Sequence, residues 1–355
     1  MRACFIFDDP NLHSTRYGWI DFAKLASHAA AHRYHAAIAT VPLDAWFSSK
    51  KSAAIFKNHP EHISLLFHGN DHVRNELVSF TSPQAALKSM GQALSRIGSL
   101  ERRTGVRVCR VMVPPHGSCS EETLSAMGRV GFQGVSTTLS SLEQWNSGKP
   151  WTKGMALRMA DVIAGLPIIP RSVLNPNSFN SILLAAYMER AMIPSGHHED
   201  LASGLEVLER TVEVIHSLGQ VQWMKMGDIA RLNYQTRRQN DVLRIKACTR
   251  LLRIAIPADV SAISIERPWL TQPEKEDIRI CPDGQGDMTF REYGGEAIAV
   301  DPSSRLEIEM VHPGQTPQGL ARVAKVKAWA FSRRLLCEGR DRLAPLRRIR
   351  NPKAF

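Results

Sequence analysis

The sequence predicts a parallel α/β fold, in the form of a barrel, followed by an all-β module and a basic helical tail. Strand-like and helix-like segments alternate about seven times over roughly the first 230 residues, which is typical of this fold class. The pattern then changes to short strands separated by Pro, Gly and Asp turns. Residues 318–355 contain eleven Lys and Arg against two acids, which indicates a basic tail.

The first strand is expected to end at a pair of carboxylates. Residues 4–7 form a short apolar run, and Pro10 stops the strand because proline cannot donate to a ladder. Asp8 and Asp9 should therefore lie at the C-terminal end of a central strand, where α/β barrels carry their catalytic groups. Two adjacent like charges are costly unless a cation or a shared proton compensates them, although Asp is also common in solvated turns.

The remaining barrel elements follow the same logic. Each expected strand is a short apolar run that ends at Pro or polar turn residues, and each expected helix repeats apolar residues at helical spacing. One long helix begins with Ser82 at its N-cap and Pro83 at the first helical position. Strands are expected at 36–41, 64–67, 106–113, 134–136, 167–170, 190–194 and 221–226, and helices at 21–35, 82–103, 121–130 and 201–215, with a short helix from Asp228.

The β module is expected to consist of closely spaced short strands. These are predicted at 243–256, 262–266, 277–281, 288–293, 297–300 and 306–311. We therefore predict three parts: a barrel over residues 1–234, a β-sandwich-like module over 235–315 and a basic helical tail over 316–355.

The net charge of +11 is concentrated in the tail. Residues 318–355 carry +9, which leaves +2 for the rest of the chain and argues against a nucleic-acid binder. No apolar run is long enough to span a membrane, and no signal peptide precedes the first strand, so we expect a cytoplasmic protein. The six cysteines lack metal-binding or redox spacing and are expected to be reduced.

Histidines follow three of the predicted strands. His68 and His72 follow the third strand, His116 the fourth, and His197 and His198 a later one. A lone His after a strand is more often a structural hydrogen-bonding group. Two imidazoles and a carboxylate with open positions for water, however, are the usual ligands of a catalytic divalent metal. The His pair together with the Asp pair therefore predicts a metal site.

The order of these motifs resembles that of the polysaccharide deacetylases of the NodB-homology class, also called carbohydrate esterase family 4. Residues 5–9 (FIFDD) resemble the first motif of that family, 68–72 have the His-x-x-x-His spacing of the second, 113–117 resemble the third and 193–198 the last. The resemblance covers about two-thirds of the chain. It implies a distorted (β/α)7 barrel and a metal-dependent hydrolase that removes an N-acyl group, acetyl or formyl, from a sugar.

The resemblance also implies roles for individual residues. Asp9, His68 and His72 would bind a divalent metal, zinc or alternatively Co, Ni or Mn. Asp8 would be the catalytic base. His197 or His198 would be the general acid, and the motif position favours His197. Four residues would line the substrate site or, alternatively, act as loop hydrogen-bonding groups: Asn11, His13, Pro115 and His116.

The chain departs from the family pattern at several positions. Pro10 follows the Asp pair where Gly is usual, Gly69 follows the first His where Ser or Thr is usual, and His116 replaces an aromatic residue. The Arg of the third motif and the Asp and Trp of the fourth have no clear counterpart. A second function therefore stays open, in which a catalytically degenerate barrel binds carbohydrate and the β module takes part in recognition.

The basic tail allows two interpretations. A basic amphipathic helix with Trp329 and Phe331 suits an anionic membrane surface, but it also suits a terminal helix docked on the barrel. Membrane contact, peripheral to the inner membrane, would favour a lipid-linked sugar as substrate. A sugar nucleotide or a polysaccharide are the other substrate classes expected, within cytoplasmic surface-polysaccharide biosynthesis such as that of O-antigen.

Overall fold

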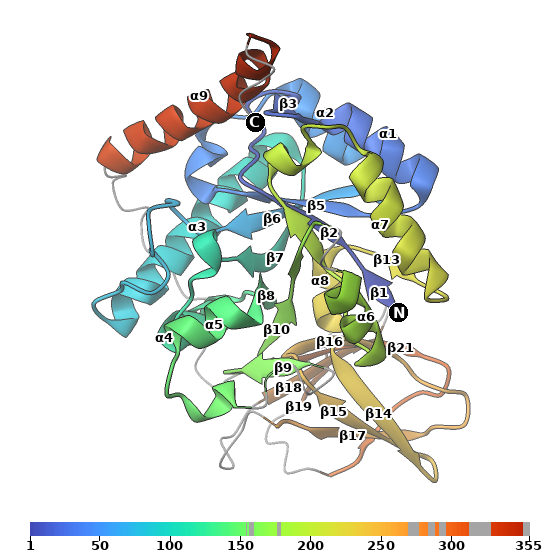
Figure 1. The fold of residues 1–355 in the computed structure, drawn as a ribbon. Helices are drawn as coiled ribbons and strands as arrows, with labels where there is room; N and C mark the ends of the chain where they lie inside the picture. Colours follow the sequence, from blue (N-terminus) through green and yellow to red (C-terminus); the bar gives the residue numbers. More distant parts are fainter. Residues whose placement is uncertain are drawn as a thin grey trace.

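A curled, mostly parallel sheet forms the centre of the barrel (Figure 1). The computed structural model of the chain describes residues 1–153, 155, 160–175, 179–268, 277–282, 288–290, 296–311 and 328–350. Within these residues the sheet has nine strands in the order β11-β12-β2-β5-β6-β7-β8-β10-β9, of which only β9 is antiparallel to its neighbour. The strands are β2 (Phe5–Asp8), β5 (Ala36–Thr40), β6 (Ile63–His68), β7 (Val108–Val113), β8 (Gly134–Thr137), β9 (Asp161–Ile163), β10 (Leu166–Pro170), β11 (Ser172–Val173) and β12 (Pro194–Gly196).

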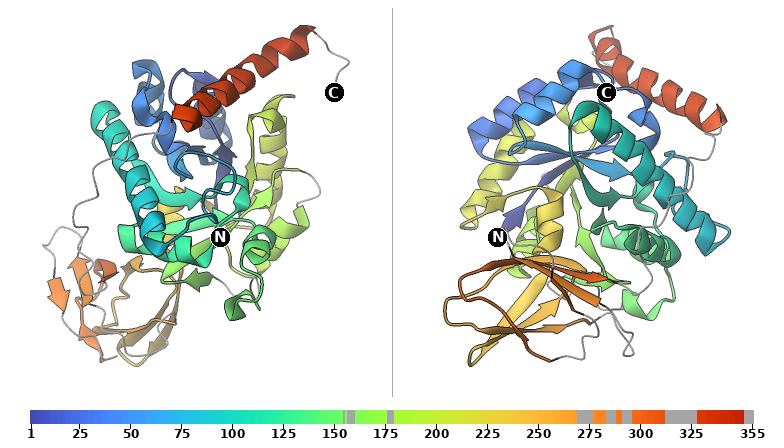
Figure 2. Two further views of the ribbon diagram at one scale, coloured as in Figure 1. Left: turned by 90° about the vertical axis from the view of Figure 1, so that its left-hand side faces the viewer. Right: turned by 180° about the vertical axis from the view of Figure 1, so that it is seen from behind.

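Helices surround this sheet (Figure 2). Asp21 caps the first helix and Ser82 caps the third, each by accepting hydrogen bonds from backbone N–H groups of the first turn. The helices are α1 (Phe22–His32), α2 (Lys50–Asn58), α3 (Pro83–Thr104), α4 (Glu121–Val130), α5 (Leu139–Trp145), α6 (Phe179–Tyr187), α7 (Glu206–Ser217) and α8 (Met226–Arg231), with 3-10 turns η1 (Pro42–Trp46), η2 (Pro115–Gly117), η3 (Pro150–Thr152) and η5 (His198–Leu201).

The strands are buried on both faces, which explains their continuous apolar runs. Phe5 and Phe7 of β2 pack in one cluster with Leu25 of α1. Ile6, between them, points to the opposite face and packs with Ile229 of α8. The short helix α8 therefore fills the inner side of the curled sheet, and the C-terminal strand ends stay available for polar groups.

Two of the predicted barrel strands are wrong. The segment 190–194 is not a strand over most of its length, and the sheet strand β12 begins only at Pro194. The segment 221–226 forms only β13 (Gln222–Trp223), which pairs with β1 (Arg2–Ala3) outside the main sheet, and α8 begins at Met226. Tertiary packing decides both cases, because a few apolar residues fit a strand or a buried helix equally well.

Residues after the barrel form two four-stranded sheets in the described part of the chain. Leu243, Ile245 and Ala247 alternate inward and share one apolar cluster with Ile278 and Ile308 of the other sheet. The sheets are β14 (Tyr234–Gln239), β15 (Val242–Ala247), β17 (Ala262–Glu266) and β20 (Ile298–Ala299), and β16 (Leu251–Ala255), β21 (Arg305–Val311), β18 (Asp277–Pro282) and β19 (Met288–Phe290). The fold class, an α/β barrel with a β module and a helical tail, is confirmed, whereas the division into independent domains at 235 and 315 stays a prediction.

The tail returns to the barrel. Helix α9 (Ala328–Arg350) lies at the end of the barrel opposite to the β module, beside the hairpin β3 (Arg16–Tyr17) and β4 (Ile20–Asp21) (Figures 1 and 2). Glu338 pairs with His13 at 3.0 Å, and Asp341 accepts a hydrogen bond from the Tyr17 hydroxyl at 2.8 Å. The tail is therefore docked on the barrel, at the end where the strands β2 and β6 finish.

Candidate active site and metal centre

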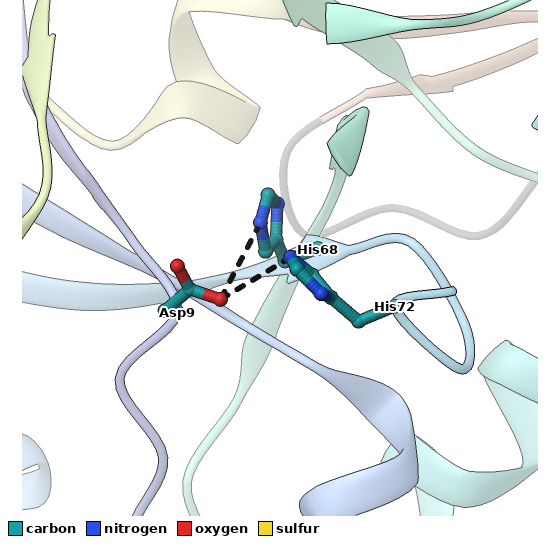
Figure 3. Close-up of side chains that lie close together, drawn as sticks. All are labelled: Asp9, His68 and His72. Carbon is teal, nitrogen blue, oxygen red and sulfur yellow. Dashed lines mark ion pairs between the residues drawn. The ribbon is translucent and has the colours of Figure 1, made fainter. Parts of the chain in front are cut away.

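Strands β2 and β6, which lie on either side of β5, bring Asp9, His68 and His72 together. Asp9 follows β2 and His68 ends β6, while His72 lies in the loop after β6. Their ligand atoms lie within 4.8 Å of one another, and Asp9 Oδ1 is 3.3 Å from His72 Nε2 and 3.9 Å from His68 Nε2 (Figure 3). They line a pocket of about 600 Å³.

The backbone turns sharply where these side chains are presented. Asp9, His72 and His116 have φ values of 84°, 55° and 56°, a conformation that side-chain-bearing residues rarely adopt. The turn at Asp9 directs its carboxylate to the histidines, while Asp8 stays within strand β2. The two adjacent carboxylates therefore point in different directions and can take different roles. This agrees with the end of the strand that Pro10 predicts.

The protonation states of the three residues suit a divalent metal. His68 Nδ1 lies 2.9 Å from the Val113 carbonyl and donates to it, so that Nε2 presents a lone pair to the site. Burial lowers the pKa of His68 and lowers that of His72 to about 3, so both imidazoles are neutral at pH 7. Burial alone would raise the pKa of Asp9. The nearby His72, His68 and Arg334 outweigh burial and hold the pKa of Asp9 well below its usual range.

The spacing also suits a metal. Two ligand atoms bound at about 2 Å to one tetrahedral ion lie roughly 3.3 Å apart, close to the 3.3 Å and 3.9 Å separations between Asp9 and the two histidines. Arg334 also lies near Asp9, with its Nη1 3.3 Å from the same Oδ1. A neutral nitrogen pair and an ionised carboxylate therefore fit the donor set of a catalytic zinc site.

Glu76 holds the loop that carries His72. Its buried carboxylate accepts hydrogen bonds from the backbone N–H groups of Asn70, Asp71 and His72 at 2.8, 2.9 and 3.1 Å. A Cβ on Gly69, whose φ is +65°, would lie 1.9 Å from Glu76 Oε1. This contact explains why glycine occupies the position where Ser or Thr was expected.

We expect Glu76→Gln to weaken zinc binding about 10- to 100-fold, because an amide nitrogen would face a backbone N–H and the loop of His72 would shift. Isothermal titration of the metal-free protein measures the affinity. Glu101→Gln is the matched control, because Glu101 also accepts a backbone N–H, that of Val108, outside the pocket. Equal zinc affinities of Glu76→Gln and Glu101→Gln would show that the contacts of Glu76 with the loop of His72 are not needed for zinc binding.

Asp8 is held by Arg171. Arg171 Nη1 donates to both Asp8 carboxylate oxygens at 2.8 Å, and both side chains are nearly buried. Burial raises the pKa of Asp8, but Arg171 and the nearby histidines more than offset it, so the pKa lies below its usual value. Asp8 is therefore ionised at neutral pH and can accept a proton.

Arg171 contacts Asp8, although the sequence motifs assigned no partner to this carboxylate. Arg110, near the third motif, pairs instead with Glu101 at 2.6 Å. Glu143 and Trp145, which are weak counterparts in the sequence of the Asp and Trp of the fourth motif, lie on α5 and are not among the described residues that line the pocket. Arg171 directly follows the predicted strand 167–170, so its position at a strand end was a usable signal.

His197 and His198 both line the pocket but differ in their surroundings. His197 is exposed, and its backbone N–H donates to Asp200 at 2.7 Å. His198 is 2% exposed and lies 5.4 Å from Trp19, ring centre to ring centre, in a near-parallel stack. A Cβ on Gly18 would collide with its ring. His198 is thus fixed by packing, whereas His197 is exposed at the pocket wall.

Helix α9 forms one wall of the same pocket. Arg334 donates to the Asp9 carbonyl oxygen at 2.7 Å and pairs with Asp44 at 2.9 Å, with both side chains buried. Arg333 donates to the His72 carbonyl oxygen. No local sequence signal indicated these contacts, because more than 250 residues separate the partners.

The predicted substrate-binding residues divide into two groups. His116 lines the pocket, with its ring 5.4 Å from that of His72. Asn11, His13 and Pro115 are not among the described residues that line it. Asn11 accepts from Arg342 at 2.9 Å and His13 pairs with Glu338, so both serve the docking of α9.

Comparison with known proteins finds no matching family model and no matching curated protein. Similar solved structures include a Mycobacterium smegmatis protein named as a polysaccharide deacetylase, at 13% identity and a TM-score of 0.46, covering 64% of this chain and 88% of that one. A family 4 carbohydrate esterase from Streptomyces lividans in complex with acetate has 11% identity and a TM-score of 0.35, and the match covers 62% of this chain and 89% of that one. A Streptococcus mutans CE4 esterase has 14% identity and a TM-score of 0.36, and the match covers 63% of this chain and 85% of that one. They belong to the family that the motifs resemble, but similarity at this level does not define chemistry, so the function rests on the pocket.

Proposed function

We propose that this chain is a metal-dependent hydrolase that removes an N-acyl group, acetyl or formyl, from a sugar. The observation that carries the proposal is the convergence of Asp9, His68 and His72 beside an ionised Asp8 in one pocket. A divalent ion held by Asp9, His68 and His72 would lower the pKa of its bound water and polarise the acyl carbonyl.

The other pocket residues supply the proton transfers. Asp8, ionised and held by Arg171, accepts a proton from the attacking water, and Arg171 keeps its carboxylate in place. His197 gives a proton to the leaving amine of the sugar, because it is the exposed histidine of the pair at this wall. His198 positions that loop through its stack on Trp19.

The proposal is tested by acyl release. The metal-loaded protein is incubated with N-acetyl and N-formyl sugars, their nucleotide derivatives and polysaccharides, and free acetate or formate is measured. We expect release from at least one substrate, its loss on chelation and its return with Zn²⁺, Co²⁺, Ni²⁺ or Mn²⁺. Absence of release from every substrate class with the loaded protein would overturn the proposal.

The alternative, a carbohydrate-binding barrel, predicts a different outcome. It would bind one of these sugars while releasing no acyl group, and chelation would leave sugar binding unchanged. The ionised Asp8 beside an intact donor set favours hydrolysis, because a binding protein has no need of either. A place in cytoplasmic surface-polysaccharide synthesis stays a prediction. The described helices include none that is long and apolar enough to cross a bilayer.

A further inference from the structure

Helix α9 is amphipathic in the reverse of the usual sense. Arg334, Glu338 and Asp341 are 2%, 7% and 4% exposed and form its inner face against the barrel. Their spacing of four and three residues puts them on one side of the helix. The inner face thus docks through ion pairs and hydrogen bonds, to Asp44 and His13 among others.

The outer face of α9 is mostly apolar. Trp329, Leu336 and Leu343 are spaced seven residues apart and therefore share the side opposite to Arg334. Trp329 is 65% exposed and Leu336 is 76% exposed. The exposed large apolar residues on the described part of α9 are Trp329, Leu335, Leu336, Leu343 and Leu346, with Ser332 and Arg340 exposed among them.

The apolar surface continues onto the barrel. Phe331 of α9 lies 5.8 Å, ring centre to ring centre, from Trp46, which in turn contacts Phe47. Trp46 and Phe47 are about half exposed. Scattered exposed apolar residues are ordinary, but a continuous apolar face on one helix, extended by two aromatic residues, marks an interaction surface.

We propose that this outer face, together with Trp46 and Phe47, binds the surface of an anionic lipid bilayer. Residues 318–355 carry +9, and Arg340 on α9 is 67% exposed beside Leu336 and Leu343. Aromatic and aliphatic side chains flanked by arginine suit the boundary between headgroups and acyl chains of such a bilayer. A second copy of the chain fits less well, because pairing would bring two strongly basic tails together.

Membrane binding through this face would place the pocket at the bilayer. Arg333, Arg334 and Cys337 line the pocket from the same helix, so one helix diameter, ~10–12 Å, would separate the pocket from the bound surface. If the chain is the proposed hydrolase, its substrate class would be a lipid-linked N-acyl sugar. Only this assignment of the substrate rests on the proposed function. Binding to lipid itself does not depend on hydrolysis.

Vesicle sedimentation of the full chain tests the proposal. We expect about tenfold or greater enrichment on phosphatidylcholine vesicles with about 30% phosphatidylglycerol over pure phosphatidylcholine, with loss of binding in high salt. The variant Trp329→Ser/Leu336→Ser/Leu343→Ser should lose the binding. The matched control is Leu183→Ser/Leu184→Ser/Tyr187→Ser, which removes exposed apolar residues from α6 and should bind normally.

Several outcomes would overturn the proposal: no sedimentation of the wild-type chain, equal sedimentation of both triple variants, or a wild-type dimer that the α9 variant converts to a monomer in light scattering. Thermal melting checks that both variants fold, and the single variant Leu336→Asp serves if the triple variant does not. Acyl release from a soluble sugar is measured separately. Loss of vesicle binding with unchanged release is therefore distinguishable from failure of the proposed function.

Discussion

Asp8→Asn is expected to abolish turnover while the metal stays bound. Asp8 is ionised and lies outside the predicted donor set, so its loss removes the base and leaves the three ligands intact. Loss of a general base typically costs about 10²- to 10⁴-fold in rate. Acyl release and bound zinc are measured on the same preparation.

Asp9→Asn is the matched control for this experiment. It changes the adjacent carboxylate by the same substitution, but it removes a predicted ligand, so zinc should be lost together with activity. The amide in Asp8→Asn can still accept from Arg171, which limits the disturbance of the fold. Near-normal turnover of Asp8→Asn, or zinc loss as complete as in Asp9→Asn, would contradict the assigned roles.

Arg334→Ala is expected to release helix α9 from the barrel. Arg334 is the cation that faces both Asp44 and Asp9, and its removal leaves those carboxylates buried without it. Burial already raises the pKa of Asp44, although Arg334 opposes this shift. Removing one partner of a buried pair typically costs about 3–5 kcal/mol, which is enough to undock one helix. Hydrogen exchange of the α9 amides measures the release.

Arg340→Ala is the control on the same helix. Arg340 is exposed, and its partner Asp341 keeps its hydrogen bond from the Tyr17 hydroxyl, so removal of Arg340 should leave the α9 amides protected. In both variants the amides of β2 and β6 should exchange as in the wild type. Wild-type protection of α9 in Arg334→Ala would show that other contacts, such as His13 with Glu338, hold the helix.

The sequence predicted the strand ends that carry the site because this information is local. Apolar runs that stop at Asp8 and His68 mark buried parallel strands, and parallel strands bring their C-terminal ends to one edge. The segment 243–256, by contrast, was predicted as one strand. The structure ends β15 at Ala247 and begins β16 at Leu251 in the other sheet. The short break at 248–250 has no Gly or Pro to mark it.

The partners that position the proposed catalytic and metal-binding groups were not predicted. Arg171 reaches Asp8 across 163 residues of sequence and Arg334 reaches Asp9 across 325. Such pairs depend on tertiary packing, which periodicity does not report. Glu76 lies closer, but its role depends on the tight loop at Gly69 rather than on any helical or strand spacing.

Zinc titration of the metal-free chain tests the central claim most directly. We expect one tight site in the wild type, its loss in His68→Ala/His72→Ala, and its retention in His28→Ala/His32→Ala. The second variant is the control, because it removes another histidine pair, which lies near Glu209 away from the pocket. If His68→Ala/His72→Ala binds zinc as tightly as the wild type, the metal site proposed at Asp9, His68 and His72 is wrong.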